Sequence, residues 1–174
     1  MAEAFSDLAQ RVAKRCRLSG TFRLRSGRTA TTYFDKYLFE ADPAILREVA
    51  EQMVPLVPDD TEVLAGLELG GVPVATALSL ATGLPAAFVR KEAKAYGTAR
   101  LAEGAVIEGR RVLVIEDVIT TGGQVARSTS DLRDRGADLD TVLCVIDRSG
   151  GDHVELDALS LQVRSLFTTA DLGG

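Results

Sequence analysis

The chain has 174 residues, of which 46% are hydrophobic and 26% charged, and its formal net charge is −5. These proportions are those of one ordinary soluble globular domain that is large enough to bury a substantial core. The negative charge argues against nucleic-acid binding as the main role, but it does not exclude a local cationic pocket for an anionic ligand.

The sequence gives no sign of membrane insertion or export. No window approaches the roughly 20 continuous apolar residues that cross a bilayer. The first residues include the acids Glu3 and Asp7, where a signal peptide would be basic. Cys16 and Cys144 lie far apart and without metal-type spacing, so we expect two buried side chains in a reducing compartment. We therefore expect a cytoplasmic protein without a membrane partner.

The predicted elements begin with a segment that lies outside the later alternation of strands and helices. Apolar periodicity, turn residues and a proline predict, in order, a helix over residues 4–17, a strand over 21–25, a turn at Ser26-Gly27, a strand over 31–34 and, after a helix start at Asp42-Pro43, a helix over 44–53. We expect the two short strands to form a small hood over the C-terminal edge of a sheet.

From residue 62 onwards, strands and helices alternate. The predicted order is a strand over 62–65, a turn at Gly70-Gly71, a helix over 72–81, a strand over 86–90, a charged loop to about 109, a strand over 112–115, a helix over 123–135, and strands over 141–146 and 161–167. This alternation predicts an α/β fold with a central, mostly parallel sheet flanked by helices. We expect a single domain over residues 1–174, with the hood to about residue 40 and the core from about residue 41.

The most informative segment runs from residue 112 to 124. A buried strand at 112–115 is followed by Glu116 and Asp117, then by a Thr-Thr-Gly-Gly turn and a helix. In open α/β sheets ligands bind at the ends of strands, and a Gly-rich turn that enters a helix offers N–H groups and a positive dipole end to a phosphate. The carboxylates could accept hydrogen bonds from sugar hydroxyls. The alternative is that they are ordinary loop acids and that a threonine of the turn caps the helix.

This segment resembles the motif with which type I phosphoribosyltransferases bind 5-phosphoribosyl 1-diphosphate (PRPP). The resemblance implies the type I phosphoribosyltransferase fold. It also implies that Glu116 and Asp117 hold the ribose hydroxyls, Asp117 as a catalytic residue, and that the turn binds the 5′-phosphate. The PRPP-binding residues expected from this motif are Glu116, Asp117, Val118, Ile119, Thr120, Thr121, Gly122, Gly123 and Gln124.

A second segment, residues 88–98, places three cations within five residues at the end of a strand. Such a loop could close over a diphosphate and neutralise it, although a solvated basic patch is the alternative. The segment looks like the mobile catalytic loop of orotate phosphoribosyltransferases, which reaches into the neighbouring site of a dimer. The resemblance implies a homodimer that shares the Arg90–Lys94 loop, PRPP binding by Arg90, Lys91, Lys94 and Tyr96, and catalytic roles for Lys91 and Lys94. Many members of the family have a histidine at the position of Tyr96. A tyrosine side chain is uncharged near neutral pH, so this position lacks the positive charge that a histidine could carry.

Residues 22–28 and 33–36 are similar to the N-terminal segment of the same family, which lines the orotate site. An aromatic face beside a guanidinium suits a flat pyrimidine that bears a carboxylate. The alternative is an amphipathic hairpin with its phenylalanine in the core. The orotate-binding residues that the resemblance implies are Arg25, Tyr33, Phe34, Thr120 and Arg148.

Residues 66–73 correspond to the diphosphate-binding loop of the family. Gly70 and Gly71 would let backbone N–H groups approach the phosphates there. The loop lacks the lysine of some relatives. Less positive charge in this loop would make Mg²⁺, the expected cofactor, and the loop from Arg90 to Lys94 more important.

The chain is thus identified as a member of the orotate phosphoribosyltransferase family. The resemblance implies that it joins orotate to PRPP, with Mg²⁺ held mainly by PRPP rather than directly by the protein, and without a nucleic-acid partner. One alternative is a purine phosphoribosyltransferase, which would need a different base pocket. Another is a non-catalytic protein that senses PRPP. His153, the single histidine, is expected in a polar turn without a functional role.

Overall fold

A computed structural model describes residues 2–23, 27–92 and 101–173, with side chains from residue 5. In chain order its elements are α1 (Ala2–Cys16), β1 (Arg17–Arg23), β2 (Thr29–Phe34), α2 (Tyr37–Glu40), α3 (Pro43–Met53), the 3-10 helix η1 (Val54–Leu56), β3 (Val63–Leu67), α4 (Gly71–Thr82), β4 (Ala86–Val89), β5 (Ala102–Gly104), β6 (Val112–Ile119), α5 (Gly123–Arg133), β7 (Thr141–Asp147), α6 (Val154–Asp157) and β8 (Gln162–Thr168). The predicted helices and the strands of the alternating region are present in the predicted order.

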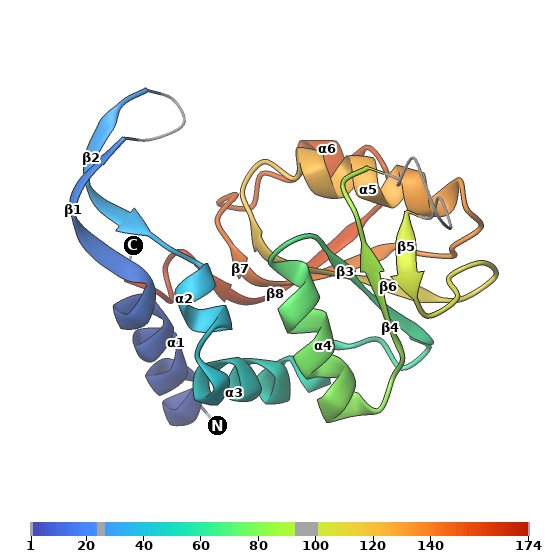
Figure 1. The fold of residues 1–174 in the computed structure, drawn as a ribbon, viewed down its shortest axis with the longest axis horizontal. Coiled ribbons are helices and arrows are strands. Elements are labelled where there is room, and N and C mark those ends of the chain that lie inside the picture. Colours follow the sequence, from blue (N-terminus) through green and yellow to red (C-terminus); the bar gives the residue numbers. More distant parts are fainter. Residues whose placement is uncertain (1, 24–26, 93–100, 174) are drawn as a thin grey trace.

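The central feature is a six-stranded sheet in the order β5-β4-β3-β6-β7-β8, with a separate hairpin of β1 and β2 (Figure 1). Neighbouring strands are parallel except for β4 and β5, which are antiparallel. Helices α1, α3 and α4 lie on one side of the sheet, and α5 and α6 on the other. The predicted α/β fold with a mostly parallel sheet is confirmed.

Several local predictions were wrong. Strand β6 continues to Ile119, because it stays paired with β7 as far as the pair Ile119 and Asp147. Glu116 and Asp117 therefore lie within a strand and not in a loop after it. The segment predicted as a charged loop contains the short edge strand β5, and the first strand of the hood begins at Arg17 rather than at residue 21. The four-residue helices α2 and α6 were not predicted, since helices this short depend on tertiary contacts.

Two helix starts show the local chemistry clearly. Asp42 caps α3, because its Oδ1 accepts hydrogen bonds from the backbone N of Ala44 and Ile45 at 3.1 and 3.2 Å, and Pro43 occupies the first turn as predicted. The residue at the start of α5 is Gly122, with φ +79°, so neither threonine of the turn is the cap. None of the helices in the described ranges is long and apolar enough to cross a membrane.

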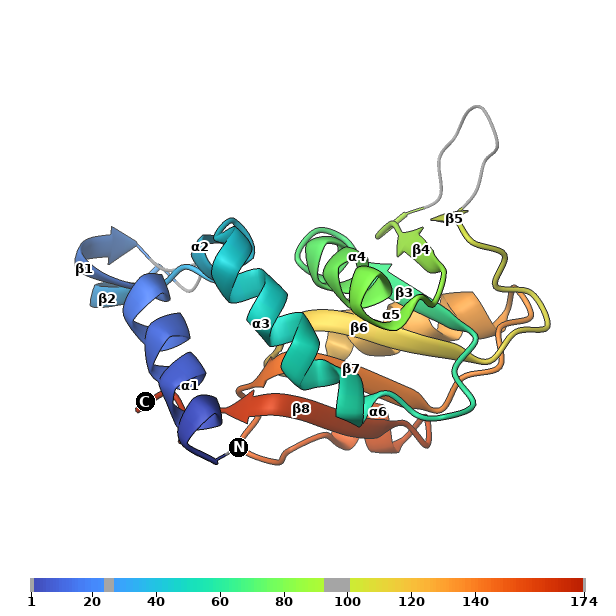
Figure 2. The same ribbon diagram turned by 90° about the horizontal axis from the view of Figure 1, so that it is seen from below.

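The core consists of two apolar clusters, one on each face of the sheet. Successive side chains of β6 alternate between them: Leu113 and Ile115 belong to one cluster, Val112 and Val114 to the other. Both faces are covered, which is why the strand reads as a continuous apolar run. Helix α1 joins the first cluster beside β8, and the hairpin lies at the same end of the molecule (Figure 2).

Both cysteines are free and buried, as expected. Burial raises the pKa of the Cys16 thiol to about 11. Burial likewise raises the pKa of Cys144 well above its usual value. Because the thiolate is the reactive form, both side chains behave as small apolar residues near neutral pH.

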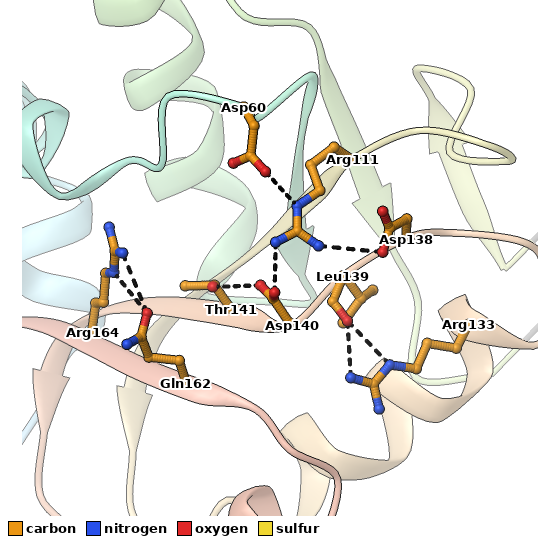
Figure 3. Close-up of polar contacts among 9 residues, drawn as sticks. All are labelled: Asp60, Arg111, Arg133, Asp138, Leu139, Asp140, Thr141, Gln162 and Arg164. Carbon is orange, nitrogen blue, oxygen red and sulfur yellow. Dashed lines mark hydrogen bonds and ion pairs between the residues drawn. The ribbon is translucent and has the colours of Figure 1, made fainter.

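Arg111 joins three loops at the N-terminal edge of the sheet (Figure 3). It directly precedes β6, and its guanidinium contacts three carboxylates, those of Asp60, Asp138 and Asp140, at 3.0, 3.2 and 2.6 Å. These acids lie just before β3 and β7, the two neighbours of β6. One side chain therefore ties together the entries to three adjacent strands.

Replacing Arg111 by methionine is expected to lower the free energy of unfolding by roughly 1–2 kcal/mol, since exposed ion pairs contribute about 0.2–1 kcal/mol each and three are lost. Urea unfolding would measure the change. Arg110→Met is the matched control, because Arg110 makes one exposed pair, with Glu62 at 2.8 Å. Equal losses in the two variants would contradict the bridging role of Arg111.

Candidate active site

The acid pair lies in the C-terminal half of the central strand β6. Glu116 and Asp117 are 8% and 0% exposed. The backbone N of Asp117 donates to Glu116 Oε1 at 3.0 Å, and the backbone N of Val118 donates to Asp117 Oδ1 at 2.6 Å. Burial in a strand with ordered carboxyl groups is not the behaviour of ordinary loop acids, so that alternative is wrong.

Two segments that are far from Asp117 in the sequence, residues 36–40 and the start of α4, converge on it. Lys36, between the hood and α2, places its Nζ 2.6 Å from Asp117 Oδ2. Gly70, before α4, lies so close that a Cβ there would be 1.7 Å from the same oxygen. Glu40, at the end of α2, is buried beside Asp117 and interacts with it. Sequence reasoning missed Lys36 and Glu40, since no local pattern marks a partner of a distant carboxylate.

Burial dominates the ionisation of this cluster. It raises the pKa of Glu116 well above the usual value, and interaction with Asp117 raises it further. Burial, followed by the hydrogen bond to Asp117, raises the pKa of Glu40 to about 9. Burial also opposes ionisation of Asp117, but the contacts of Glu116, Glu40 and Lys36 hold its pKa below the usual value. These shifts favour ionisation of Asp117 over ionisation of Glu116 and Glu40.

The turn after β6 leads directly into the N-terminus of α5. Gly122 adopts a left-handed conformation and packs on Leu156, where a Cβ would lie 2.9 Å from the leucine side chain, so both its backbone and its surroundings require glycine. Thr120 and Thr121 are exposed, and Gln124 Nε2 donates to Ser128 Oγ at 3.2 Å. Strand, turn and helix follow one another as predicted, but the two acids lie inside the strand and not after it. The first backbone N–H groups of α5 have no partner within the helix and are free to bind a phosphate.

A cavity of about 360 Å³ lies between the hood and the C-terminal ends of β7 and β8. It is lined by Arg17, Ala30, Thr32, Tyr33, Phe34, Arg148, Thr169 and Leu172. Within it, the guanidinium carbon of Arg148 lies 5.8 Å from the centre of the Phe34 ring. Phe34 also packs against the first apolar cluster, so the alternative of a core role holds for part of its surface.

The structure thus brings together three of the predicted orotate residues, Tyr33, Phe34 and Arg148. Thr120 does not line this cavity; it follows Ile119, whose carbonyl accepts a hydrogen bond from the backbone N of Arg148 at 2.8 Å. Arg25 lies outside the described residues. Arg17 and Thr169 line the cavity without having been predicted, because the fold brings them in from distant parts of the chain.

The loop that carries Arg148 is held by polar contacts around His153. His153 Nε2 lies 3.0 Å from Asp147 Oδ2 and 2.9 Å from Ser149 Oγ, and the backbone N of Ser149 donates to Asp147 Oδ1 at 2.9 Å. Burial raises the pKa of Asp147, but the hydrogen bonds of Ser149 and the contact with His153 outweigh this effect and hold the pKa below its usual value. His153, expected to have no role, therefore belongs to a polar network beside this cavity.

Arg90 follows β4 at the same edge of the sheet. Its backbone N donates to the carbonyl of Leu101 at 2.9 Å, and its Nε is buried with no hydrogen-bond partner in the described ranges. Lys91 is exposed. Lys94 and Tyr96 lie outside the described residues, so their predicted roles stay predictions.

Gly70 and Gly71 are needed for close packing, a reason that differs from the predicted one. A Cβ on Gly71 would lie 2.4 Å from the carbonyl oxygen of Ile115 in β6. The two glycines thus let the start of α4 approach the central strand. In the same loop the Glu68–Leu69 peptide is cis and Leu69 is 64% exposed. Phosphate binding by this loop stays a prediction.

Comparisons with known proteins agree with this geometry. The model of the phosphoribosyl transferase domain matches residues 39–163. The orotate phosphoribosyltransferase of Nocardioides sp. is 57% identical over 167 residues, which cover 96% of this chain and 93% of that protein. The crystal structure of Mycobacterium tuberculosis orotate phosphoribosyltransferase in complex with Fe(III) dicitrate has a TM-score of 0.89 and 37% identity, covering 98% of this chain and 99% of that one. Its complex with PRPP gives a TM-score of 0.84 and 33% identity, with the same coverage.

The sheet order, the buried acids of β6 and the turn into α5 define the type I phosphoribosyltransferase fold. The sequence identity with orotate phosphoribosyltransferases, which extends over nearly the full length of the chain, identifies the family within this class. The chain belongs to the orotate phosphoribosyltransferase family, as its sequence motifs had indicated.

Proposed function

We propose that this chain transfers the 5-phosphoribosyl group from PRPP to orotate, giving orotidine 5′-monophosphate and diphosphate in pyrimidine biosynthesis. The observation that carries the proposal is the position of the base cavity, which opens at the same sheet edge as Asp117 and the N-terminus of α5. An arginine over a phenylalanine ring suits a flat pyrimidine with a carboxylate, in contrast to a purine. The names of the relatives, and the PRPP bound to one of them, support it.

The chemistry that these residues supply is mostly positional and electrostatic. The carboxylate of Asp117 accepts hydrogen bonds from the ribose hydroxyls, and Glu116 forms further hydrogen bonds with them. The turn from Thr120 to Gln124 binds the 5′-phosphate. The bond between the sugar carbon and the diphosphate oxygen breaks, the diphosphate leaves with the electron pair, and positive character develops on that carbon. An orotate nitrogen forms the new bond and loses its proton, which the departing diphosphate can accept. Val118 and Ile119 connect the two acids to the turn, and their part in PRPP binding is through the backbone.

Cations neutralise the diphosphate as it leaves. The Nε of Arg90 is buried and has no hydrogen-bond partner among the described residues. This favours an oxygen of the bound diphosphate as its partner. Lys91 and Lys94 are assigned catalytic roles and Tyr96 a hydrogen bond to phosphate. Gly70 and Gly71 border the same ligand.

The proposal includes a homodimer in which the loop from Arg90 to Lys94 serves the site of the partner subunit. Its support is the resemblance of this loop to the family's mobile loop and the exposure of Lys91. The buried, unpaired cysteines favour the cytoplasm as the compartment.

Mg²⁺ is the proposed cofactor, held mainly by PRPP. In the described ranges no three His, Cys, Asp or Glu side chains form a cluster that could hold a metal ion. In proteins Mg²⁺ usually keeps several waters and is held by one or two carboxylates together with substrate phosphates. Its chemistry there would be neutralisation of charge on the diphosphate.

The first test is a spectrophotometric assay with PRPP, Mg²⁺ and one base at a time: orotate, uracil, hypoxanthine or adenine. We expect consumption of orotate alone, with release of diphosphate. Turnover of a purine would leave the PRPP site in place but overturn the assignment of Tyr33, Phe34 and Arg148. Tight PRPP binding without turnover of any base would favour the PRPP-sensing alternative.

A further inference from the structure

Lys36 links the hood to the acid pair of β6. Strand β2 ends at Phe34, which lines the base cavity, and Lys36 follows two residues later. The segment between them is anchored, because the backbone N of Asp35 donates to the carbonyl of Cys16 at 2.8 Å. The Lys36 ammonium therefore reaches Asp117 from a fixed backbone.

The contact of Lys36 with Asp117 joins a half-exposed cation to a fully buried anion. The two side chains are 33% and 0% exposed, and Nζ lies 2.6 Å from Oδ2. A carboxylate withdrawn from water is costly unless it is paired and hydrogen-bonded. Oδ1 accepts the backbone N–H of Val118. Oδ2 has the ion pair with Lys36 but no hydrogen-bond partner among the described residues, and a Cβ on Gly70 would lie 1.7 Å from it. The carboxylate is therefore confined to one orientation.

Glu40 completes the surroundings of this carboxylate. It is 8% exposed, and its Oε1 is buried without a hydrogen-bond partner among the described residues. Since burial raises its pKa to about 9, Glu40 is protonated near neutral pH. A protonated Glu40 can donate a hydrogen bond to Asp117 instead of repelling it. Lys36 and Glu40 thus act on Asp117 from the same short segment.

We propose that Lys36 is a positioning residue for PRPP, which keeps the Asp117 carboxylate charged and in one orientation toward the ribose hydroxyls, with Glu40 beside it. This role rests on the proposed function, since it concerns the ribose half of PRPP. A charged acceptor binds a hydroxyl more strongly than a neutral one, so the effect should appear in PRPP affinity and not in orotate affinity.

The test compares Lys36→Met with Lys36→Arg by calorimetric titration with PRPP and Mg²⁺ and by steady-state kinetics. Lys36→Met should weaken PRPP binding about tenfold and raise KM for PRPP similarly, because a charge-assisted hydrogen bond is replaced by a weaker one. KM for orotate should change by less than about twofold, and Lys36→Arg should recover most of the loss because it keeps the cation. Arg47→Met is the control: its pair with Glu51 is exposed and lies on α3.

PRPP binding by Lys36→Met that equals or exceeds that of the wild type would overturn the proposal, since Lys36 would then be dispensable or would compete with the ligand. Equal losses for both substrates in both variants, with lower melting temperatures, would show a merely structural role and also overturn it. If Lys36→Met does not fold, Lys36→Arg decides, because a tenfold loss there contradicts the proposal. If the wild-type protein binds no PRPP, the proposed function itself is contradicted. If the wild type turns over and the Lys36→Met variant is unaffected, only the role of Lys36 is contradicted.

Discussion

Replacing Gly70 by alanine is expected to lower kcat/KM for PRPP by at least about a hundredfold, because small displacements of a catalytic group are this costly. The backbone of Gly70 has φ −68°, which alanine adopts without strain, so the effect is purely steric. The new Cβ would lie 1.7 Å from Asp117 Oδ2. Since Asp117 is fully buried, its carboxylate can give way only by turning out of the position set by Lys36 and the backbone N of Val118.

Initial rates at varied PRPP, together with urea unfolding, would measure this effect. Gly83→Ala is the matched control at the other end of α4. Gly83 has φ +79° and no described heavy atom within 4 Å of the Cβ position, so alanine costs about 1 kcal/mol of backbone strain but touches no part of the site. Activity of Gly70→Ala within about threefold of the wild type would mean that Asp117 can move without consequence, against the proposed role of its orientation.

The strand at residues 112–115 and the glycine turn into a helix could be predicted because the forces that shape them are local. A β-branched apolar run favours a strand that is buried on both faces. Gly122 supplies the positive φ that starts α5, and the Asp42-Pro43 pair starts α3 by equally local rules. In each case the residues that determine the structure are neighbours in the sequence.

The surroundings of Asp117 could not be predicted, because they depend on contacts between distant segments. Gly70 looked like a residue for phosphate approach, yet its backbone would suit any residue and the space is taken by Asp117. Lys36 and Glu40 carry no signal of their own in the sequence. The end of β6 was misplaced for a similar reason: its pairing with β7, which carries the strand through Glu116 and Asp117, is a property of the sheet and not of the local sequence.

Replacing Lys91 by methionine is expected to lower kcat by about a hundredfold or more while leaving KM for orotate nearly unchanged. Its charge is assigned to the diphosphate as it leaves, and removal of one such electrostatic contact costs about 10²–10³ in rate. The exposure of Lys91 makes a large loss of stability unexpected. Lys91→Arg keeps the charge and should retain a substantial part of the rate; unchanged turnover in Lys91→Met would contradict the loop assignment.

Subunit exchange then shows which chain supplies the loop. If Lys91 acts on the partner's site, mixing Lys91→Met with Asp117→Asn should restore up to about a quarter of the wild-type activity, since half of randomly formed dimers are mixed and each has one intact site. Mixing Asp117→Asn with Gly70→Ala is the control, because these lesions lie in contact in the same site and no exchange can separate them. Rescue in the first mixture alone would establish a shared loop. Failure in both would place the loop over the site of its own chain, whose Arg90 directly follows β4, two strands from β6 and Asp117 in the sheet.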